Sequence, residues 1–92
     1  MDSTRKVTIC NRQGLHARPC HAIVTLALGF KGELRVRLGD NEVNGKSILE
    51  LMTLNAYCGT VLELRARGEN AEDVLTQLTE LISSGFGEDL ER

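Results

Sequence analysis

The sequence predicts an α+β fold, an open-faced β-sandwich in which three helices cover one face of a small sheet. The expected order of elements is strand, helix, strand, strand, helix, strand, helix. Each expected strand has a single apolar row, so helices need to cover only one side and the other side can be solvated. The length of 92 residues, of which 41% are hydrophobic, suits one domain over residues 1–92.

The first part of the chain predicts a strand followed by a helix. Residues 5–10 alternate between apolar and polar side chains, as in a half-buried strand, and residues 11–14 break the alternation. From Ala17 onward the apolar residues fall close to helical spacing, with Gly29 as the expected terminator. The first helix therefore follows directly after a loop.

The middle of the chain predicts a hairpin and a short helix. Residues 33–38 alternate, and the turn-forming residues 39–41 precede a short run through Val43, which favours a hairpin. Ser47 stands where an N-cap is expected, and Glu50, three residues later, completes a capping-box pattern. A short helix should begin there.

The last part of the chain predicts a fourth strand and the most amphipathic helix. Residues 61–67 alternate again, and apolar residues then recur at helical spacing as far as Ile82. Asn70 is expected to cap this helix, because Asn70 with Asp73 resembles a second capping arrangement. Residues 83–92 form an acidic, partly frayed tail, of which we expect 84–92 to be flexible.

Composition and charge argue against several classes of function. The formal net charge of −2 argues against nucleic acid as the main ligand, and an aromatic content of 3% leaves little to stack on bases. No stretch approaches the roughly 20 apolar residues of a bilayer span, so we expect no membrane insertion and a cytoplasmic location. Three cysteines without paired spacing fit reduced thiols.

The most informative stretch is residues 14–19, Gly-Leu-His-Ala-Arg-Pro, where the first strand gives way to the first helix. Pro19 fits only in the first helical turn, so the helix should begin near Ala17 with His16 at its start. The free amides and partial positive charge of a helix N-terminus favour a phosphate, and Arg18 adds a permanent positive charge. Because a neutral imidazole is nucleophilic, this arrangement predicts a histidine that carries a phosphoryl group.

The same residues allow other interpretations. A histidine at a helix start is more commonly a cap or a surface residue, and Ser47 by spacing alone is a plain N-cap. Metal-ligand residue types occur close together at the start of the chain, but without paired Cys-x-x-Cys spacing, so we expect neither a metal site nor a cofactor. The residues in question are Cys10, His16, Cys20 and His21.

Residues 14–19, followed by Val-Asn-Gly-Lys-Ser-Ile-Leu at 43–49, resemble the HPr family of phosphocarrier proteins of the bacterial phosphotransferase system. The resemblance covers about residues 4–83, with both motifs in the family's order and separation. It implies a single HPr-like domain with a four-stranded antiparallel sheet and three helices, in the order β-α-β-β-α-β-α.

The resemblance also implies a function, that of a carrier phosphorylated on His16 and not of an enzyme. Enzyme I, charged by phosphoenolpyruvate, would donate the phosphoryl group, and an enzyme IIA-type protein would accept it. Arg18 matches the family's active-site arginine. The backbone amides of Ala17 and Arg18, together with the side chain of Gln13, are expected to bind the phosphate.

Ser47 matches the family's regulatory serine, which an ATP-dependent HPr kinase/phosphorylase phosphorylates in many bacteria, and a transcription regulator is a further implied partner. A phosphate at a helix N-terminus is electrostatically tolerated. Ile48, Leu49 and Met52 are expected to form an exposed apolar patch that docks partners, with at least one of the three in the core. Nothing in the sequence demands more than a monomer.

The chain departs from the family pattern in two places. Cys20 and His21 stand where small apolar residues are usual, and we expect both to face outward. Residues 85–88 extend past a minimal HPr and are similar to endings in regulatory branches of the family. The sequence therefore leaves open a phosphocarrier that serves sugar transport and, as the alternative, a mainly regulatory interaction module controlled by phosphorylation of Ser47.

Overall fold

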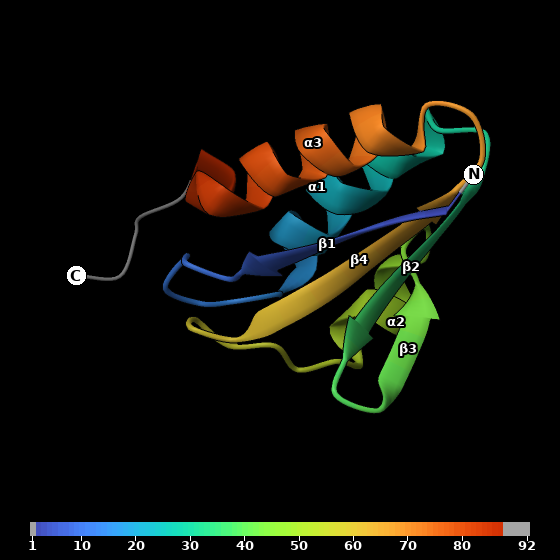
Figure 1. Ribbon diagram of the computed structural model, residues 1–92. Coiled ribbons are helices and arrows are strands. Elements are labelled where there is room, and N and C mark those ends of the chain that lie inside the picture. The colour runs from blue at the N-terminus through green and yellow to red at the C-terminus, as the bar shows by residue number, and fades with distance from the viewer. Residues whose placement is uncertain (1, 88–92) are drawn as a thin grey trace.

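The computed structural model describes residues 2–87, which form a four-stranded sheet covered on one face by three helices (Figure 1). The strand order is β1-β4-β2-β3, and each neighbouring pair is antiparallel. The predicted fold class and order of elements are confirmed. The strands are β1 (Asp2–Thr8), β2 (Glu33–Leu38), β3 (Asn41–Asn44) and β4 (Val61–Arg67), and the helices are α1 (Ala17–Leu28), α2 (Ile48–Met52) and α3 (Ala71–Ser83).

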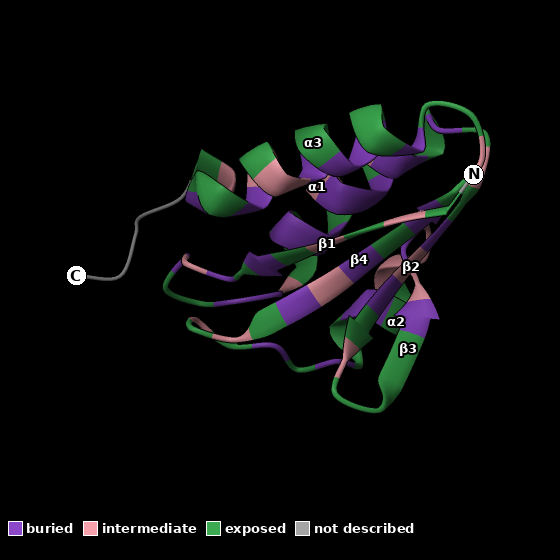
Figure 2. Cartoon of the chain, viewed as in Figure 1, coloured by how far each residue is buried: buried purple, intermediate pink, exposed green. Residues whose placement is uncertain are grey.

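The core lies between the sheet and the helices, because each strand turns one apolar row toward them. In β4, for example, Leu62, Leu64 and Ala66 are buried while the residues between them reach solvent (Figure 2). The edge strand β1 begins at Asp2, three residues earlier than predicted. Its first residues lack apolar alternation and are recruited by backbone pairing with β4.

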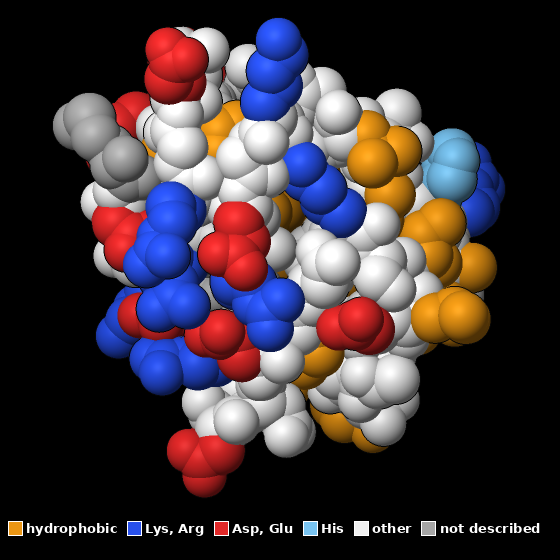
Figure 3. All heavy atoms as spheres, turned by 90° about the vertical axis from the view of Figure 1, so that its right-hand side faces the viewer, with side chains coloured by type: hydrophobic (Ala, Val, Ile, Leu, Met, Phe, Trp, Pro, Cys, Tyr) orange, Lys and Arg blue, Asp and Glu red, His pale blue; other side chains and the backbone are white. Residues whose placement is uncertain are grey.

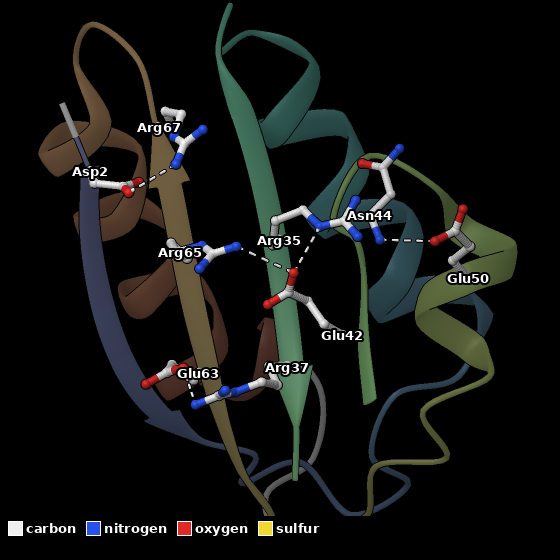
Figure 4. A network of polar contacts seen from close by, with 9 residues as sticks. All are labelled: Asp2, Arg35, Arg37, Glu42, Asn44, Glu50, Glu63, Arg65 and Arg67. Atoms are coloured by element: carbon white, nitrogen blue, oxygen red, sulfur yellow. Dashed lines mark hydrogen bonds and ion pairs between the residues drawn. The ribbon is translucent and has the colours of Figure 1, made fainter. Parts of the chain in front are cut away.

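The face of the sheet without helices is covered by charged side chains. Arg35 and Arg65 lie opposite each other on β2 and β4, and the Glu42 carboxylate on β3 receives a hydrogen bond from each, at 3.3 Å (Figure 4). Exposed ion pairs contribute only about 0–1 kcal/mol each, so this network keeps the face polar more than it stabilises the fold. Two further ion pairs on this face are Arg37–Glu63 and Arg67–Asp2.

The long helix α3 buries one apolar stripe against the sheet, which includes Leu75, Leu78 and Ile82. The prediction that Asn70 caps this helix is wrong. Asn70 stands at the N-cap position but adopts a left-handed conformation with φ 67°, and its side chain makes no capping hydrogen bond. Within residues 2–87, no helix has the length and apolar character needed to cross a bilayer.

The predicted flexible tail, residues 84–92, falls largely outside the described residues, which end at Gly87. Ser84 ends α3, and a short 3₁₀ turn, η1 (Gly85–Gly87), follows it. Phe86 in this turn is half-buried and packs against the core. Residues 84–87 are therefore attached to the domain, and the prediction for 88–92 lies outside the described residues.

Candidate functional site

His16 is the N-cap residue of α1, as the position of Pro19 predicts. Its backbone is extended, with φ −109° and ψ −168°, and its carbonyl accepts a hydrogen bond from the Cys20 amide at 3.0 Å. The side chain is partly exposed and does not cap the helix. The ring therefore stands at the positive end of a helix of 12 residues.

The first turn of α1 offers two backbone amides beside His16. The Cys20 amide is the first to bond within the helix, and Pro19 has no N–H to offer. This leaves the amides of Ala17 and Arg18 without an acceptor inside the helix. Both residues are exposed, so the amides and the Arg18 guanidinium can meet an anion from solvent.

The loop before His16 is held by a buried side chain that no sequence pattern indicates. Asn11 is 0% exposed, and its Nδ2 donates to the Gly14 carbonyl at 2.8 Å. The same carbonyl accepts the His16 N–H at 3.1 Å, and the Gly14 N–H donates to the Asn11 carbonyl at 3.2 Å. Asn11 therefore fixes the turn that presents His16, whereas by sequence it is an ordinary turn residue.

The loop before His16 is also held in place by the segment after α2, which no sequence pattern connects with the site. The Leu15 N–H donates to the Ala56 carbonyl at 2.9 Å, and the Gly14 Cα packs against the backbone of Ala56 and Tyr57. Gln13 lies exposed at a corner of the turn that ends at Gly14. The structure thus places Gln13, His16, Ala17 and Arg18 on one loop and helix start, with His16 partly exposed and the other three exposed.

Ser47 caps α2 as predicted, but only half of the capping box forms. Its Oγ accepts the Glu50 N–H at 3.1 Å, while the Glu50 carboxylate accepts the Asn44 N–H at 2.9 Å instead of the Ser47 N–H. The Ser47 N–H already donates to the Asn44 carbonyl at 3.1 Å, so it needs no second acceptor. Ser47 is partly exposed.

The start of α2 is tied to the end of α1 through Lys46. Its ammonium donates to the Phe30 carbonyl at 2.6 Å and lies 5.8 Å from the centre of the Phe30 ring. An ammonium near a helix C-terminus and over an aromatic face is favourable in both respects. Lys46 thus fixes the position of Ser47 relative to α1.

The predicted apolar patch on α2 is divided between surface and core. Leu49 is 79% and Met52 38% exposed, whereas Ile48 is half-buried and packs against the core. Tyr57, which no motif in the sequence singles out, is 72% exposed and follows the Ala56 contact with the His16 loop. Figure 3 shows hydrophobic side chains grouped beside a histidine, away from the mixed charges of the open sheet face.

The prediction that Cys20 faces outward is wrong, whereas His21 is exposed as expected. Cys20 lies on the same helical stripe as the buried Ile23 and Val24, so helix periodicity places it in the core. Burial raises the pKa of its thiol to about 11. Within residues 2–87, no three His, Cys, Asp or Glu side chains gather as a metal site requires.

Comparison with known sequences agrees with this geometry. A family model described as "PTS HPr component phosphorylation site" matches residues 3–84. The phosphocarrier protein HPr of Neisseria meningitidis serogroup A is 43% identical over 84 residues, which cover 91% of this chain and 94% of that protein. The phosphocarrier protein NPr of Escherichia coli K12 is 33% identical over 90 residues, covering 97% of this chain and 100% of that one.

Solved structures show the same fold. HPr-C-His from Thermoanaerobacter tengcongensis superposes with a TM-score of 0.91 at 38% identity, covering 96% of this chain and 99% of that one. HPr from Bacillus anthracis gives a TM-score of 0.83 at 27% identity, covering 88% of this chain and 96% of that one. The chain belongs to the HPr family, the phosphate-carrying proteins of the phosphotransferase system.

Proposed function

We propose that His16 accepts a phosphoryl group from phosphorylated enzyme I, which obtains it from phosphoenolpyruvate, and passes it to an enzyme IIA-type protein. The observation that carries this proposal is the position of His16 at the start of α1, beside two amides without intrahelical acceptors. A phosphoryl group on the ring can reach both a helix N-terminus and solvent. Solvent access is what a carrier needs, because two different proteins must approach the same atom.

The transfer itself needs little covalent machinery from this chain. A neutral ring nitrogen of His16 attacks the phosphorus of the donor's phosphohistidine, and the new N–P bond forms as the donor's N–P bond breaks. No net proton moves, since one imidazole replaces another. The amides of Ala17 and Arg18, the Arg18 guanidinium and the Gln13 amide group stabilise the phosphoryl charge.

Docking and regulation belong to α2. Leu49 and Met52, with the exposed edge of Ile48, form the apolar surface that partners contact. A single chain supplies both this surface and the groups around His16, so the carrier acts as a monomer. We infer that an HPr kinase/phosphorylase modifies Ser47, a partly exposed residue that directly precedes this surface in the chain. The added charge disfavours an apolar or acidic partner surface, and the altered surface is the one that a transcription regulator would recognise.

The decisive experiment is incubation with labelled phosphoenolpyruvate and enzyme I. We expect an acid-labile label in the parent protein that is absent from His16→Ala, and His21→Ala is the matched control because His21 is exposed on the same helix. Arg18→Ala should reduce the rate of labelling much more than it reduces stability, since an exposed arginine contributes little to folding.

Two results would contradict the proposal. Labelling that survives in His16→Ala would place the phosphoryl group elsewhere. Labelling by ATP at Ser47 alone, with none from phosphoenolpyruvate, would identify a regulatory module that no longer carries phosphoryl groups.

A further inference from the structure

Arg12 and Arg18 differ from the other arginines in residues 2–87, because they make no ion pair there. Both are exposed, and they lie on the two segments that flank His16. The other five are all held by carboxylates at 2.7 to 3.4 Å. These paired arginines are Arg5, Arg35, Arg37, Arg65 and Arg67.

The hydrogen bonds of the loop connect the turn that carries Arg12 to the backbone of His16. Arg12 follows the buried Asn11 at the first corner of the turn that ends at Gly14. The Gly14 carbonyl accepts both the Asn11 Nδ2, at 2.8 Å, and the His16 N–H, at 3.1 Å. One carbonyl group therefore joins the residue before Arg12 to the backbone of His16, so Arg12 lies on the same hydrogen-bonded loop as the histidine.

A phosphoryl group on His16 carries more negative charge than the groups on α1 can compensate. A phosphoryl group carries about −1.5 to −2 charges at neutral pH and three acceptor oxygens. Because Pro19 has no N–H, the first turn supplies only the amides of Ala17 and Arg18. Arg18 adds one full positive charge, which leaves the second negative charge uncompensated by α1.

We propose that Arg12 is the second guanidinium that binds the phosphoryl group on His16. This inference rests on the proposed function, since it needs His16 to be phosphorylated. In this proposal Arg12 contacts the phosphoryl group within the phosphorylated protein itself. Its role is therefore distinct from that of a residue that contacts a partner protein. The cost to folding of losing Arg12 is small, because its side chain is exposed and makes no ion pair within residues 2–87.

The test uses a small phosphoryl donor, potassium phosphoramidate, so that no protein partner is involved. The parent is the His21→Gln variant, in which His16 is the only remaining histidine of the two in the sequence. The last protonation of the phosphoryl group is followed by ³¹P NMR at low salt. The helices that adjoin the site carry Arg18 on α1, Glu50 on α2, and Glu72, Asp73 and Glu80 on α3, and all variants keep these groups.

We expect Arg12→Gln to make the phosphoryl group bind its last proton roughly fivefold more tightly, the effect of losing one charge at about 4 Å in water. Arg35→Gln removes the same charge from the open sheet face and is the matched control, which should leave proton binding unchanged. In the parent, phosphorylation should also shift the Nε–H signal of Arg12 and not that of Arg35.

Three outcomes would overturn the inference, and they can be told apart. If Arg12→Gln behaves like the parent, or if Arg35→Gln changes proton binding equally, Arg12 does not bind the phosphoryl group, and the proposed function is unaffected. If Arg12→Gln leaves proton binding unchanged but slows transfer from enzyme I in a separate assay at low salt, Arg12 faces the partner instead. If the folded parent forms no phosphohistidine, the proposed function fails and this inference fails with it.

Discussion

Gly14 lies so close to the carbonyl of Ala56 that a Cβ at position 14 would overlap the carbonyl oxygen. Gly14 also has φ +71°, in the left-handed region that disfavours other residues. The next residue, Leu15, donates its N–H to the same carbonyl at 2.9 Å. This contact fixes the His16 loop to the segment after α2, so the site depends on two parts of the chain about 40 residues apart.

The first prediction follows from that contact and concerns Gly14→Ala. Strain at a positive φ costs of order 1–3 kcal/mol, and here the overlap with Ala56 adds to it. Gly39→Ala is the control, since Gly39 has a similar φ of +60° but no atom within 4 Å of the place that the alanine methyl group would take. Urea denaturation should show a clearly larger loss of stability for Gly14→Ala than for Gly39→Ala. Equal losses would mean that the backbone at Ala56 moves away from the added methyl group without any loss of stability.

The second prediction separates capping from charge at Ser47. The Ser47 Oγ accepts the Glu50 N–H, so Ser47→Ala should lower the free energy of unfolding by about 1 kcal/mol. Ser47→Asp retains a good cap and should preserve stability. Only Ser47→Asp should slow phosphorylation of His16 by enzyme I, because only it adds negative charge beside the docking surface.

Thermal unfolding and phosphorylation kinetics at moderate salt measure the two effects on the same samples. Comparable slowing in Ser47→Ala would show that the loss of the cap is what matters, and that charge at Ser47 plays no part.

The third prediction compares two neighbouring leucines of α2. Leu49 is 79% exposed, so Leu49→Ser should change stability by less than about 0.5 kcal/mol while weakening the binding of enzyme I. Leu51 is 0% exposed, so Leu51→Ala should cost roughly 2–5 kcal/mol. Calorimetric titration and denaturation distinguish them, and unchanged binding by Leu49→Ser would remove Leu49 from the docking surface.

Local signals explain why so much of the fold could be predicted. Period-two alternation predicts β2 and β4, and helical spacing predicts α3, because each pattern reflects which side of one element is buried. The position of Pro19 predicts the start of α1 at Ala17, since proline tolerates only the first turn. These inferences need no knowledge of distant residues.

The features that could not be predicted depend on tertiary contacts. Asn11 is a polar loop residue by sequence, and only the packing of the loop shows that it is fully buried. The Ala56 contact with Gly14 joins segments that no local pattern connects. Asn70 has the right residue type for a cap, but its backbone is left-handed and its side chain makes no capping hydrogen bond.

The fourth prediction concerns Cys20, which is fully buried with a thiol pKa raised to about 11. At pH 8 its thiolate population should be about a hundredfold below that of an unperturbed thiol, so iodoacetamide should modify the partly exposed Cys58 first. Mass spectrometry of the native and urea-unfolded protein measures this order. Early modification of Cys20 in the native protein would show that the first helix opens readily.

The same pKa difference predicts a loss of stability in alkali. The unfolded chain releases the Cys20 proton near pH 9, the ordinary value, whereas the folded protein retains it to about pH 11. The folded state therefore binds more protons across this interval, and stability must fall as pH rises through it. Because Cys20→Ala lacks this group, its stability should fall less steeply between pH 9 and 11, which denaturation at several pH values would measure. Parallel pH profiles for the two proteins would mean that the buried thiol ionises as readily as an exposed one.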